Sequence, residues 1–333
     1  MIPTEVMSNA FTIFAGTANP ALTAAISHEL GVTVGACTID KFPDGEIAIQ
    51  LRESVRRKEV FLVQPTSPPV NDHLVELLAL ADACRRAAAE RITAVVPYFG
   101  YGRADKRQGR SEPITGRMVA DVLQAVGITH VITVDAHTPQ IEGFFAIPVD
   151  TLTAAPALCR ALQARLLPDI VVVAPDTGRM QMAAHYAQCL GLPVIVLHKR
   201  RNGARRIKIT HVIGDVSNRP CLIVDDMIST GNTVSESIRA LLAAGARPEF
   251  IVATTHGLFR AGAREKLEHP NVRAVYATDA VPIAEKGWTK LHVVSIAPLI
   301  ANALAELLTA ASCTGTAAMA ERRRAGRSAP RPC

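Results

Sequence analysis

The chain has 333 residues, 49% of them hydrophobic and 20% charged, so it is long enough for about two domains with buried cores. No apolar run reaches the roughly 18 residues that a membrane span needs, and the N-terminus lacks the basic-then-apolar order of a secretion signal. The formal charge of +6 is concentrated in the last residues, and with 4% aromatics the nearly neutral body argues against a nucleic-acid-binding surface.

The cysteines and the C-terminus indicate where the protein works and where its folded part ends. The seven cysteines are scattered and form no C-x-x-C pair, which is typical of reduced thiols in a cytoplasmic protein and not of a disulfide framework or a zinc site. Residues 312–333 are rich in Ala, Gly, Pro and Arg. They predict a disordered basic tail.

The first predicted elements of the chain flank a turn that has either a structural or a ligand-binding role. The sequence predicts a strand at 11–16, a helix at 20–30 and strands at 36–39 and 47–51. Between the last two strands, the Pro-Asp-Gly sequence favours the turn of a hairpin. Alternatively, the turn offers Phe42 as a stacking platform, with Asp44 and Glu46 as hydrogen-bond acceptors.

A second loop with polar and aromatic residues follows a buried strand. The sequence predicts a strand at 60–65, a helix at 71–86 and a strand at 92–97. Aromatic, glycine and basic residues come next, where open α/β sheets bind ligands. Arg103, Lys106 and Arg107 therefore face a polyphosphate or, in the alternative interpretation, belong to a solvated charged loop.

The next strand leads into a loop that contains His137. The pattern indicates a helix at 113–126 and a strand at 131–134, followed by the polar segment Asp135–Gln140. His137 is a candidate member of a Mg²⁺ site, although Mg²⁺ prefers oxygen ligands. On the residues alone, a structural hydrogen-bonding histidine is the favoured interpretation.

After residue 145 the alternation of strands and helices begins again. The second half is predicted to contain helices at 152–166, 180–190, 234–245 and 298–308 and strands at 170–174, 193–197, 221–224, 250–257, 275–278 and 292–296. This alternation predicts two α/β domains, each with a mainly parallel sheet flanked by helices. We place the domains at 1–148 and 149–311, with the tail at 312–333.

A basic segment separates two strands of the second half. It begins with Lys199 and Arg201 and continues through the polar, glycine-containing residues 202–211. One interpretation is a lid that carries the two cations over a substrate. The other is a solvated hairpin at the edge of the sheet.

The segment 221–234 combines a strand, two acids, a loop rich in hydroxyls and glycine, and a helix start. Backbone N–H groups at the helix start and the hydroxyls of Thr230 and Thr233 can point at one phosphate. Asp225 and Asp226 would repel a polyphosphate but suit the vicinal hydroxyls of a sugar. We therefore predict a ribose-5-phosphate subsite, the alternative being acids that merely cap the helix.

This segment resembles the phosphoribosyl diphosphate binding motif of the phosphoribosyltransferase fold. Over residues 11–308 the chain resembles the ribose-phosphate diphosphokinases, also called phosphoribosyl pyrophosphate synthetases. The similarity rests on segments that occur in the order of that family: Phe42–Glu46, Pro97–Arg103, Val134–Phe145, Ala174–Gly178, Lys199–Arg201 and Val224–Thr233. It implies an α/β fold of two tandem phosphoribosyltransferase-like domains.

The resemblance also implies an activity and partners. The family transfers the β,γ-diphosphoryl group of ATP to the C1 hydroxyl of ribose 5-phosphate, with Mg²⁺, to give phosphoribosyl diphosphate and AMP. It binds ATP across a subunit interface, so a homo-oligomer built of dimers, up to a hexamer, is expected. Nucleic acid and membrane partners are not expected.

The resemblance assigns roles to individual residues. It implies Lys199 and Arg201 as catalytic cations and His137 and Asp176 as members of the Mg²⁺ site. The ATP-binding positions that it implies are Phe42, Asp44, Gly45, Glu46 and Arg103. The ribose-5-phosphate-binding positions are Arg201, Asp225, Asp226, Ser229, Thr230, Gly231, Asn232 and Thr233.

Several positions depart from the family pattern. Ser229 stands where the family usually has an acid, Ala104 where it has glutamine, and Gly178-Arg179 where it has two glycines. The loop 106–113 is one residue shorter than in the common phosphate-activated type, so neither phosphate activation nor ADP inhibition is predicted.

Two other functions fit parts of the sequence. A catalytically silent regulatory subunit is motivated by Ser229 and Ala104, but the retained Lys199 and His137 argue against it. A phosphoribosyltransferase that consumes phosphoribosyl diphosphate explains the segment 221–234 but not the ATP-type segments of the first half.

Overall fold

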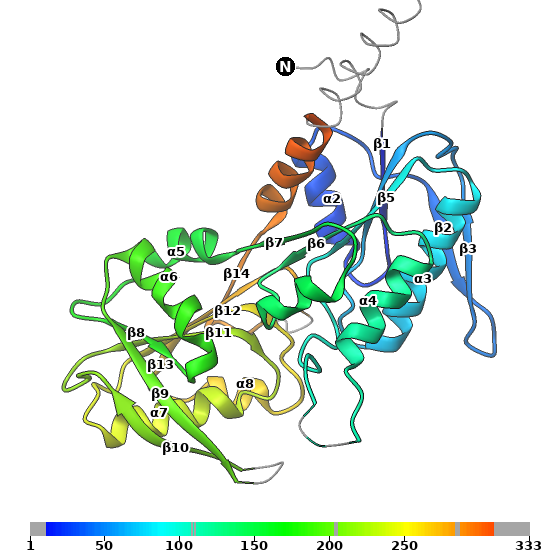
Figure 1. Ribbon diagram of the computed structural model, residues 1–333. Coiled ribbons are helices and arrows are strands. Elements are labelled where there is room, and N and C mark those ends of the chain that lie inside the picture. The colour runs from blue at the N-terminus through cyan, green and yellow to red at the C-terminus, as the bar shows by residue number, and fades with distance from the viewer. Residues whose placement is uncertain (1–10, 108, 110, 203–205, 284–286, 310–333) are drawn as a thin grey trace, which may run out of the picture.

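The computed structural model describes residues 11–107, 109, 111–202, 206–283 and 287–309, and the side chains of residues 199–210 lie outside that description. It contains a sheet in each half of the chain and a separate two-stranded hairpin (Figure 1). The expected tail at 312–333 lies outside the described residues. Within them, no helix combines the length and the apolar character needed to cross a bilayer.

The first half forms a five-stranded, entirely parallel sheet in the order β1-β4-β5-β6-β7. Its strands are β1 (Phe11–Ala15), β4 (Glu59–Val63), β5 (Arg91–Val96), β6 (His130–Val134) and β7 (Val149–Leu152). The helices are α2 (Pro20–Glu29), α3 (Val70–Arg86) and α4 (Thr115–Ala125). Alternate residues of β4 pack on opposite faces: Val60 and Leu62 lie in the core of α3 and α4, whereas Phe61 and Val63 lie in the core of α2. Continuous apolar strands are therefore required here, because both faces are covered.

The strand β7 lies where the sequence places the domain boundary, at 145–152. Val149–Leu152 pairs in parallel with β6 and therefore forms the last strand of the first sheet. The sequence predicted a helix from residue 152, whereas the helix α5 begins only at Ala155 and ends at Gln163. The helix expectation was therefore wrong at residues 152–154, where Leu152 still pairs with β6, and at residues 164–166, which follow the end of α5.

The predicted turn around Pro43 belongs to a β-hairpin. The strands β2 (Cys37–Lys41) and β3 (Ile47–Leu51) pair in antiparallel register and form a sheet of their own. Two backbone hydrogen bonds close the turn. Phe42 N donates to Glu46 O at 2.8 Å, and Gly45 N donates to Phe42 O at 2.9 Å. The hairpin projects beyond α3 at one edge of the molecule (Figure 1).

The second half forms a seven-stranded sheet in the order β10-β9-β8-β11-β12-β13-β14. Its strands are β8 (Val171–Ala174), β9 (Val194–Asn202), β10 (Arg206–Ile213), β11 (Cys221–Ile228), β12 (Phe250–Gly257), β13 (Val272–Thr278) and β14 (Leu291–Val294). Besides α5, the helices are α6 (Met180–Leu190), α7 (Asn232–Ala243), the short α8 (Ala263–Leu267), which the sequence did not predict, and residues 297–309. The chain moves from β8 outward to β9 and then returns to β11 on the other side of β8, which creates a topological switch point between the ends of β8 and β11.

The basic segment after residue 198 forms an edge hairpin. The strands β9 and β10 pair in antiparallel register, with Lys199 opposite Ile209 and Arg201 opposite Ile207. The last pairing of β9 with β8 joins Val196 to Ala174. The hairpin therefore continues past the carboxyl edge of the sheet. Whether its cations cover a substrate or face solvent stays a prediction.

One hydrophobic core is shared by the two halves. It contains Ile13 and Leu22 of the first half together with Leu222, Ile300 and Leu304 of the second. The C-terminal helix of residues 297–309 lies beside α2, against the first sheet (Figure 1). The last helix in the sequence thus completes the first domain.

Buried polar contacts also join the halves. The Thr255 hydroxyl donates to Asp135 Oδ2 at 2.5 Å, and His256 Nε2 lies 2.9 Å from the carbonyl oxygen of Val134. A carbonyl only accepts, so Nε2 carries the proton. Burial lowers the pKa of His256, so the neutral Nε2–H imidazole is the form that joins β12 to β6.

We expect the C-terminal helix to stabilise the whole molecule and not the second half alone. Leu304 is fully buried in the shared core, so Leu304→Ala should lower the free energy of unfolding by about 3 kcal/mol through lost burial and the cavity left behind. Urea unfolding followed by circular dichroism measures this. The control Val293→Ala, at a position 52% exposed, should change stability by less than about 0.5 kcal/mol.

Candidate functional site

The candidate site lies at the switch point of the second sheet. β8 ends at Ala174 and leads through Asp176 into the 3₁₀ turn Thr177–Arg179. The neighbouring strand β11 carries Asp225 and Asp226 near its carboxyl end. Parallel pairing of β8 and β11 brings these segments to the same edge, as the switch-point rule for open α/β sheets predicts.

A histidine from the first half completes this group. His137 Nδ1 lies 2.7 Å from Asp226 Oδ2, although the two residues are 89 positions apart. Because a carboxylate accepts, a proton on Nδ1 makes this hydrogen bond. The contact holds the imidazole ring against β11. The same loop is tied down by the Thr138 hydroxyl, which donates to Asp105 Oδ2 at 3.0 Å.

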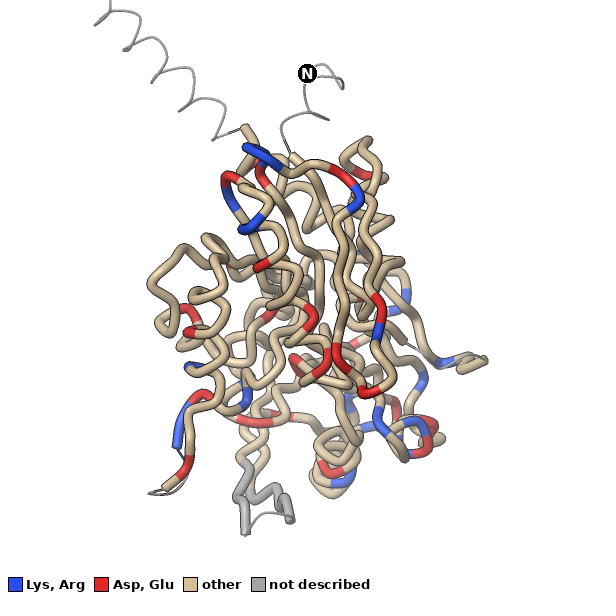
Figure 2. Tube along the Cα trace, turned by 90° about the vertical axis from the view of Figure 1, so that its right-hand side faces the viewer, with Lys and Arg blue, Asp and Glu red and all other residues tan. Residues whose placement is uncertain are grey.

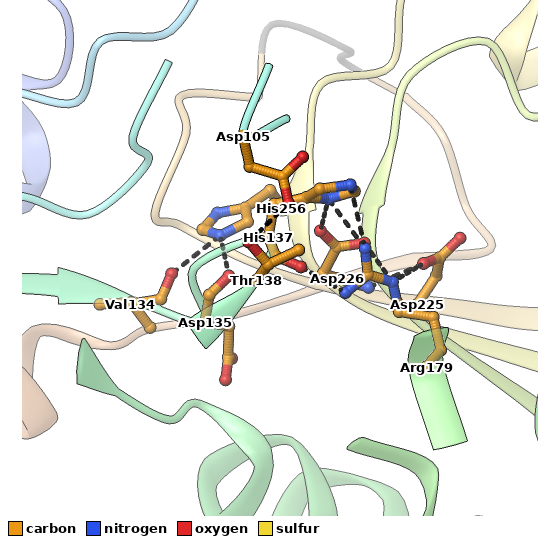
Figure 3. Close-up of polar contacts among 9 residues, drawn as sticks. All are labelled: Asp105, Val134, Asp135, His137, Thr138, Arg179, Asp225, Asp226 and His256. Atoms are coloured by element: carbon orange, nitrogen blue, oxygen red, sulfur yellow. Dashed lines mark hydrogen bonds and ion pairs between the residues drawn. The ribbon is translucent and has the colours of Figure 1, made fainter. Parts of the chain in front are cut away.

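Arg179 lies at the centre of the group (Figure 3). Its Nη1 donates to the carbonyl oxygen of His137 at 2.8 Å, and its Nε lies 3.1 Å from Asp226 Oδ1 and 3.4 Å from Asp225 Oδ1. Its Nη2 lies 2.8 and 3.3 Å from the two ring nitrogens of His137. Only 12% of the Arg179 side chain is exposed. The guanidinium therefore lies within the group as a buried cation.

The two carboxyl groups differ in their electrostatic environment. Burial and the neighbouring Asp226 raise the pKa of Asp225 well above its usual value. Burial also acts to raise the pKa of Asp226, but the hydrogen bond from His137 and the charge of Arg179 outweigh it and lower this pKa to about 2. Asp226 is thus the ionised partner of Arg179, and Asp225 is the carboxyl that holds its proton more tightly.

The loop after β11 has the geometry of an anion site. Gly231 adopts φ +72° at the start of α7, without a side-chain cap. A Cβ there would lie 3.4 Å from the carbonyl oxygen of Ala263. The first N–H groups of the helix have no intrahelical acceptor and face the direction in which a phosphate would bind. The predicted residues Ser229, Thr230, Gly231, Asn232 and Thr233 all lie in this loop or in the first turn of α7.

Arg103 lies beside a separate cavity in the first half. This cavity has a volume of about 530 Å³ and is lined by Pro69, Val70, Asn71, Asp72, Tyr98, Tyr101, Arg103 and Ala104. The absence of a long side chain at Ala104 leaves space beside Arg103. Tyr98 joins the cavity to the domain junction, because its ring packs edge-on against His256 at 5.1 Å between centroids.

The other predicted ATP-binding residues lie on the hairpin β2–β3. Phe42, Asp44, Gly45 and Glu46 form its turn, and the Phe42 side chain is 55% exposed. Lys41 binds Asp72, which lines the cavity at Arg103, with Nζ and Oδ2 2.7 Å apart. The hairpin is thus tied to the rim of the cavity, while its aromatic ring is directed to solvent.

The predicted catalytic cations lie on the hairpin β9–β10. Lys199 and Arg201 are three and five residues past Val196, the last residue of β9 that pairs with β8. At about 3.3 Å per residue, Lys199 lies about 10 Å beyond this point, on the edge of the sheet that carries Asp176. Their side chains are outside the described residues, so their contacts stay a prediction.

The role of His137 and Asp176 in binding Mg²⁺ stays a prediction, and a guanidinium contacts the first of these two residues. Arg179 lies between His137 and the two carboxylates, and Asp226 accepts from both His137 and Arg179. Within the described part of the chain, no group of three or more His, Cys, Asp or Glu side chains is placed to hold an ion. The cation of this group is therefore a guanidinium.

Sequence reasoning missed the role of Arg179. The only indication in the sequence was that Arg179 stands where the family usually has glycine. This difference does not reveal which residues the side chain contacts. By contrast, Asp225, Asp226 and His137 were all predicted as site residues, and the structure brings them into one group.

Comparison with known families supports this description. The family model for the N-terminal domain of ribose phosphate pyrophosphokinase matches residues 11–127. The model for the phosphoribosyl transferase domain matches residues 148–283. The two matches follow each other along the chain, as the two sheets do.

Individual relatives cover almost the whole chain. A ribose-phosphate pyrophosphokinase from Chromobacterium violaceum is 42% identical over 295 residues, which are 88% of this chain and 90% of the relative. That of Corynebacterium efficiens is 40% identical over 91% of this chain and 94% of its own length. The crystal structure of phosphoribosylpyrophosphate synthetase from Mycobacterium smegmatis superposes with a TM-score of 0.84, at 39% identity over 90% of this chain and 99% of that one.

The electrostatic asymmetry predicts opposite effects of two conservative substitutions. Asp226→Asn removes the ionised partner of buried Arg179 and should lower the free energy of unfolding by about 3 kcal/mol at pH 7. Asp225→Asn should leave stability unchanged or raise it at pH 7, because it removes a carboxyl whose ionisation folding opposes. Denaturant unfolding in metal-free buffer measures both.

The pH dependence provides a second measurement on the same variants. The pKa of Asp226 is lowered in the folded protein to about 2 from a usual value of 3.8. Its stabilising contribution should therefore be complete above about pH 4 and lost as the pH falls toward 2. The stability difference between the wild type and Asp226→Asn should shrink over that range. Equal losses for both variants at pH 7 would contradict the assignment.

Proposed function

The chain belongs to the ribose-phosphate pyrophosphokinase family, and from that premise we propose that it transfers the β,γ-diphosphoryl group of ATP to the C1 hydroxyl of ribose 5-phosphate. The products are phosphoribosyl diphosphate and AMP. The observation that carries this proposal is the pairing, at one switch point, of an acidic pair with an uncapped helix start.

The sugar phosphate fits this switch point on two grounds. The free N–H groups at the start of α7 and the hydroxyls of Thr230 and Thr233 suit the 5-phosphate. Asp225 and Asp226 lie on the preceding strand β11 and suit the hydroxyls of the ribose ring, because carboxyl oxygens accept hydrogen bonds. Only a short loop separates the two features, so one molecule of ribose 5-phosphate can contact both.

The nucleotide fits the cavity at Arg103, and its base fits a neighbouring subunit. The cavity of about 530 Å³ offers Arg103 to the phosphates. Phe42, at 55% exposure on a projecting hairpin, is suited to stack on a base bound by another copy of the chain. We therefore propose a homo-oligomer built of dimers in which the hairpin β2–β3 completes the partner's ATP site.

Catalysis in this arrangement consists mainly of alignment and charge stabilisation. The anomeric oxygen forms a bond to the β-phosphorus and releases its proton, while the bond from that phosphorus to the oxygen of AMP breaks and AMP leaves with the electron pair. Negative charge moves onto the leaving group, which cations stabilise best when water is excluded. We propose that Lys199 and Arg201, which belong to the hairpin that extends beyond the edge of the sheet, close over this point.

Mg²⁺ remains part of the proposal as a component of the bound nucleotide. It prefers oxygen ligands and usually binds through substrate phosphates, water and one or two carboxylates. Arg179 Nη2 lies 2.8 Å from Nδ1 of His137, so a cation already contacts one of the two predicted metal residues. We therefore propose that the ion enters with ATP, where it neutralises phosphate charge.

Charge and cysteine chemistry suit small anionic substrates and a reducing compartment. Lys and Arg positions are interspersed with Asp and Glu around the molecule (Figure 2), which does not favour a nucleic-acid partner. The described cysteines are all free thiols. This is compatible with a cytoplasmic location.

The direct test is an assay of purified protein with Mg²⁺, ATP and ribose 5-phosphate. We expect AMP and phosphoribosyl diphosphate to appear in equal amounts, because one transfer releases both. Substrate binding without formation of AMP would contradict the proposal and support a regulatory subunit.

Substitution of Lys199 distinguishes an effect on the chemical step from an effect on ATP binding. Lys199→Ala should reduce turnover by at least about a hundredfold while ATP binding changes little, because the lysine stabilises charge that develops in the transition state. Steady-state kinetics and calorimetric titration with ATP measure the two effects. Arg117→Ala, which removes an exposed cation of α4, is the control, and equal rates for Lys199→Ala and wild type would remove Lys199 from the chemistry.

A further inference from the structure

Arg179 contacts several of the residues that form the candidate site. It is the last residue of the turn after β8 and immediately precedes α6. From there its side chain contacts Asp225 and Asp226 on β11 and His137 after β6. A single guanidinium on the turn after β8 thus contacts β11 of the second half and the loop after β6 of the first.

These contacts occupy the atoms that ligands would need. Asp226 Oδ1 and Asp225 Oδ1 both face Nε of Arg179, at 3.1 and 3.4 Å. The ring nitrogens Nδ1 and Nε2 of His137 lie 2.8 and 3.3 Å from Nη2. Sugar hydroxyls and a metal ion would have to share or replace these contacts.

The guanidinium also supplies the local positive charge. Asp225 and Asp226 are buried, with exposures of 8% and 1%, and buried charges require a partner. Arg179 is that partner in the described structure. Its removal would leave a pocket of carboxyl oxygens and an imidazole nitrogen, which is the ligand chemistry that divalent cations select.

We propose that Arg179 is an internal counter-cation that competes with a divalent metal ion for the pocket formed by His137, Asp225 and Asp226. The proposal rests on the proposed function for the identity of the substrates, but the competition is a property of the free protein. The guanidinium fills the pocket, so a metal ion has to enter with the nucleotide or displace Arg179. Arg179 is accordingly a positioning residue that sets the metal requirement of the enzyme.

Geometry explains why the two cations exclude each other. The guanidinium donates along fixed directions to acceptors on β11 and on the loop after β6, whereas a metal ion would bring the same carboxylate and imidazole atoms to about 2 Å. Both cations would need the same atoms: Asp226 Oδ1, which lies 3.1 Å from Nε of Arg179, and the imidazole, whose nearer nitrogen lies 2.8 Å from Nη2. Binding of one therefore requires departure of the other.

The experiment measures Mn²⁺ binding to the substrate-free protein. Mn²⁺ binds oxygen and imidazole ligands and is detected directly by electron paramagnetic resonance or calorimetry. Wild type, Arg179→Ala and Arg179→Gln are compared, and the glutamine variant keeps an amide donor in case the alanine variant fails to fold. Arg117→Ala removes one exposed positive charge on α4 and controls for net charge.

We expect Arg179→Ala and Arg179→Gln to bind Mn²⁺ at least about tenfold more tightly than wild type, because a competing cation is removed. Arg117→Ala should bind as the wild type does. Folding of each variant is verified by circular dichroism. Folded Arg179 variants with unchanged Mn²⁺ affinity would overturn the proposal.

A double variant locates the new metal site. In Arg179→Gln with His137→Ala, the gain in Mn²⁺ affinity should disappear, because the imidazole ligand is lost. Persistence of the gain would place the ion elsewhere and contradict the proposed pocket. None of these measurements requires turnover, so a protein without diphosphokinase activity would refute the proposed function and leave this inference testable.

Discussion

The contact of Asp226 with His137 and Arg179 is the interaction on which the candidate site depends. Neither half of the chain contains the site by itself, because the histidine follows β6 of the first sheet and the acids lie on β11 of the second. The buried carboxylate is stable there only because an imidazole N–H and a guanidinium satisfy it. The charges of the site are therefore paired only when the two halves are packed in this arrangement.

Most of the fold could be predicted from sequence because it follows from local pattern. The apolar run at 221–224 reads as a strand buried on both faces, and the structure confirms it as part of β11. The prediction was wrong at residue 152, where a short strand, β7, replaces the start of a helix. Four residues carry too little pattern to reveal a strand whose existence depends on its partner β6. The short α8 was missed for a similar reason.

The residues of the candidate site were likewise predictable only where a local sequence pattern marks them. Asp225, Asp226 and His137 were identified because each follows a strand and belongs to a recognisable segment, and the structure places them together. Arg179 was identified only as a departure from a glycine. Its direction depends on carboxylates that lie about 46 residues further along the chain, which no local rule supplies. Contacts of Lys199 and Arg201 remain predictions, since their side chains are outside the described residues.

The junction between the halves limits how the enzyme can move. Thr255 and His256 bind the first half through buried hydrogen bonds, and Leu304 packs in a core that both halves share. Hinge bending between the domains would break these contacts together, at a cost far above thermal energy. We therefore expect water to be excluded from the site by a local rearrangement of a loop or hairpin and not by the two halves closing on each other.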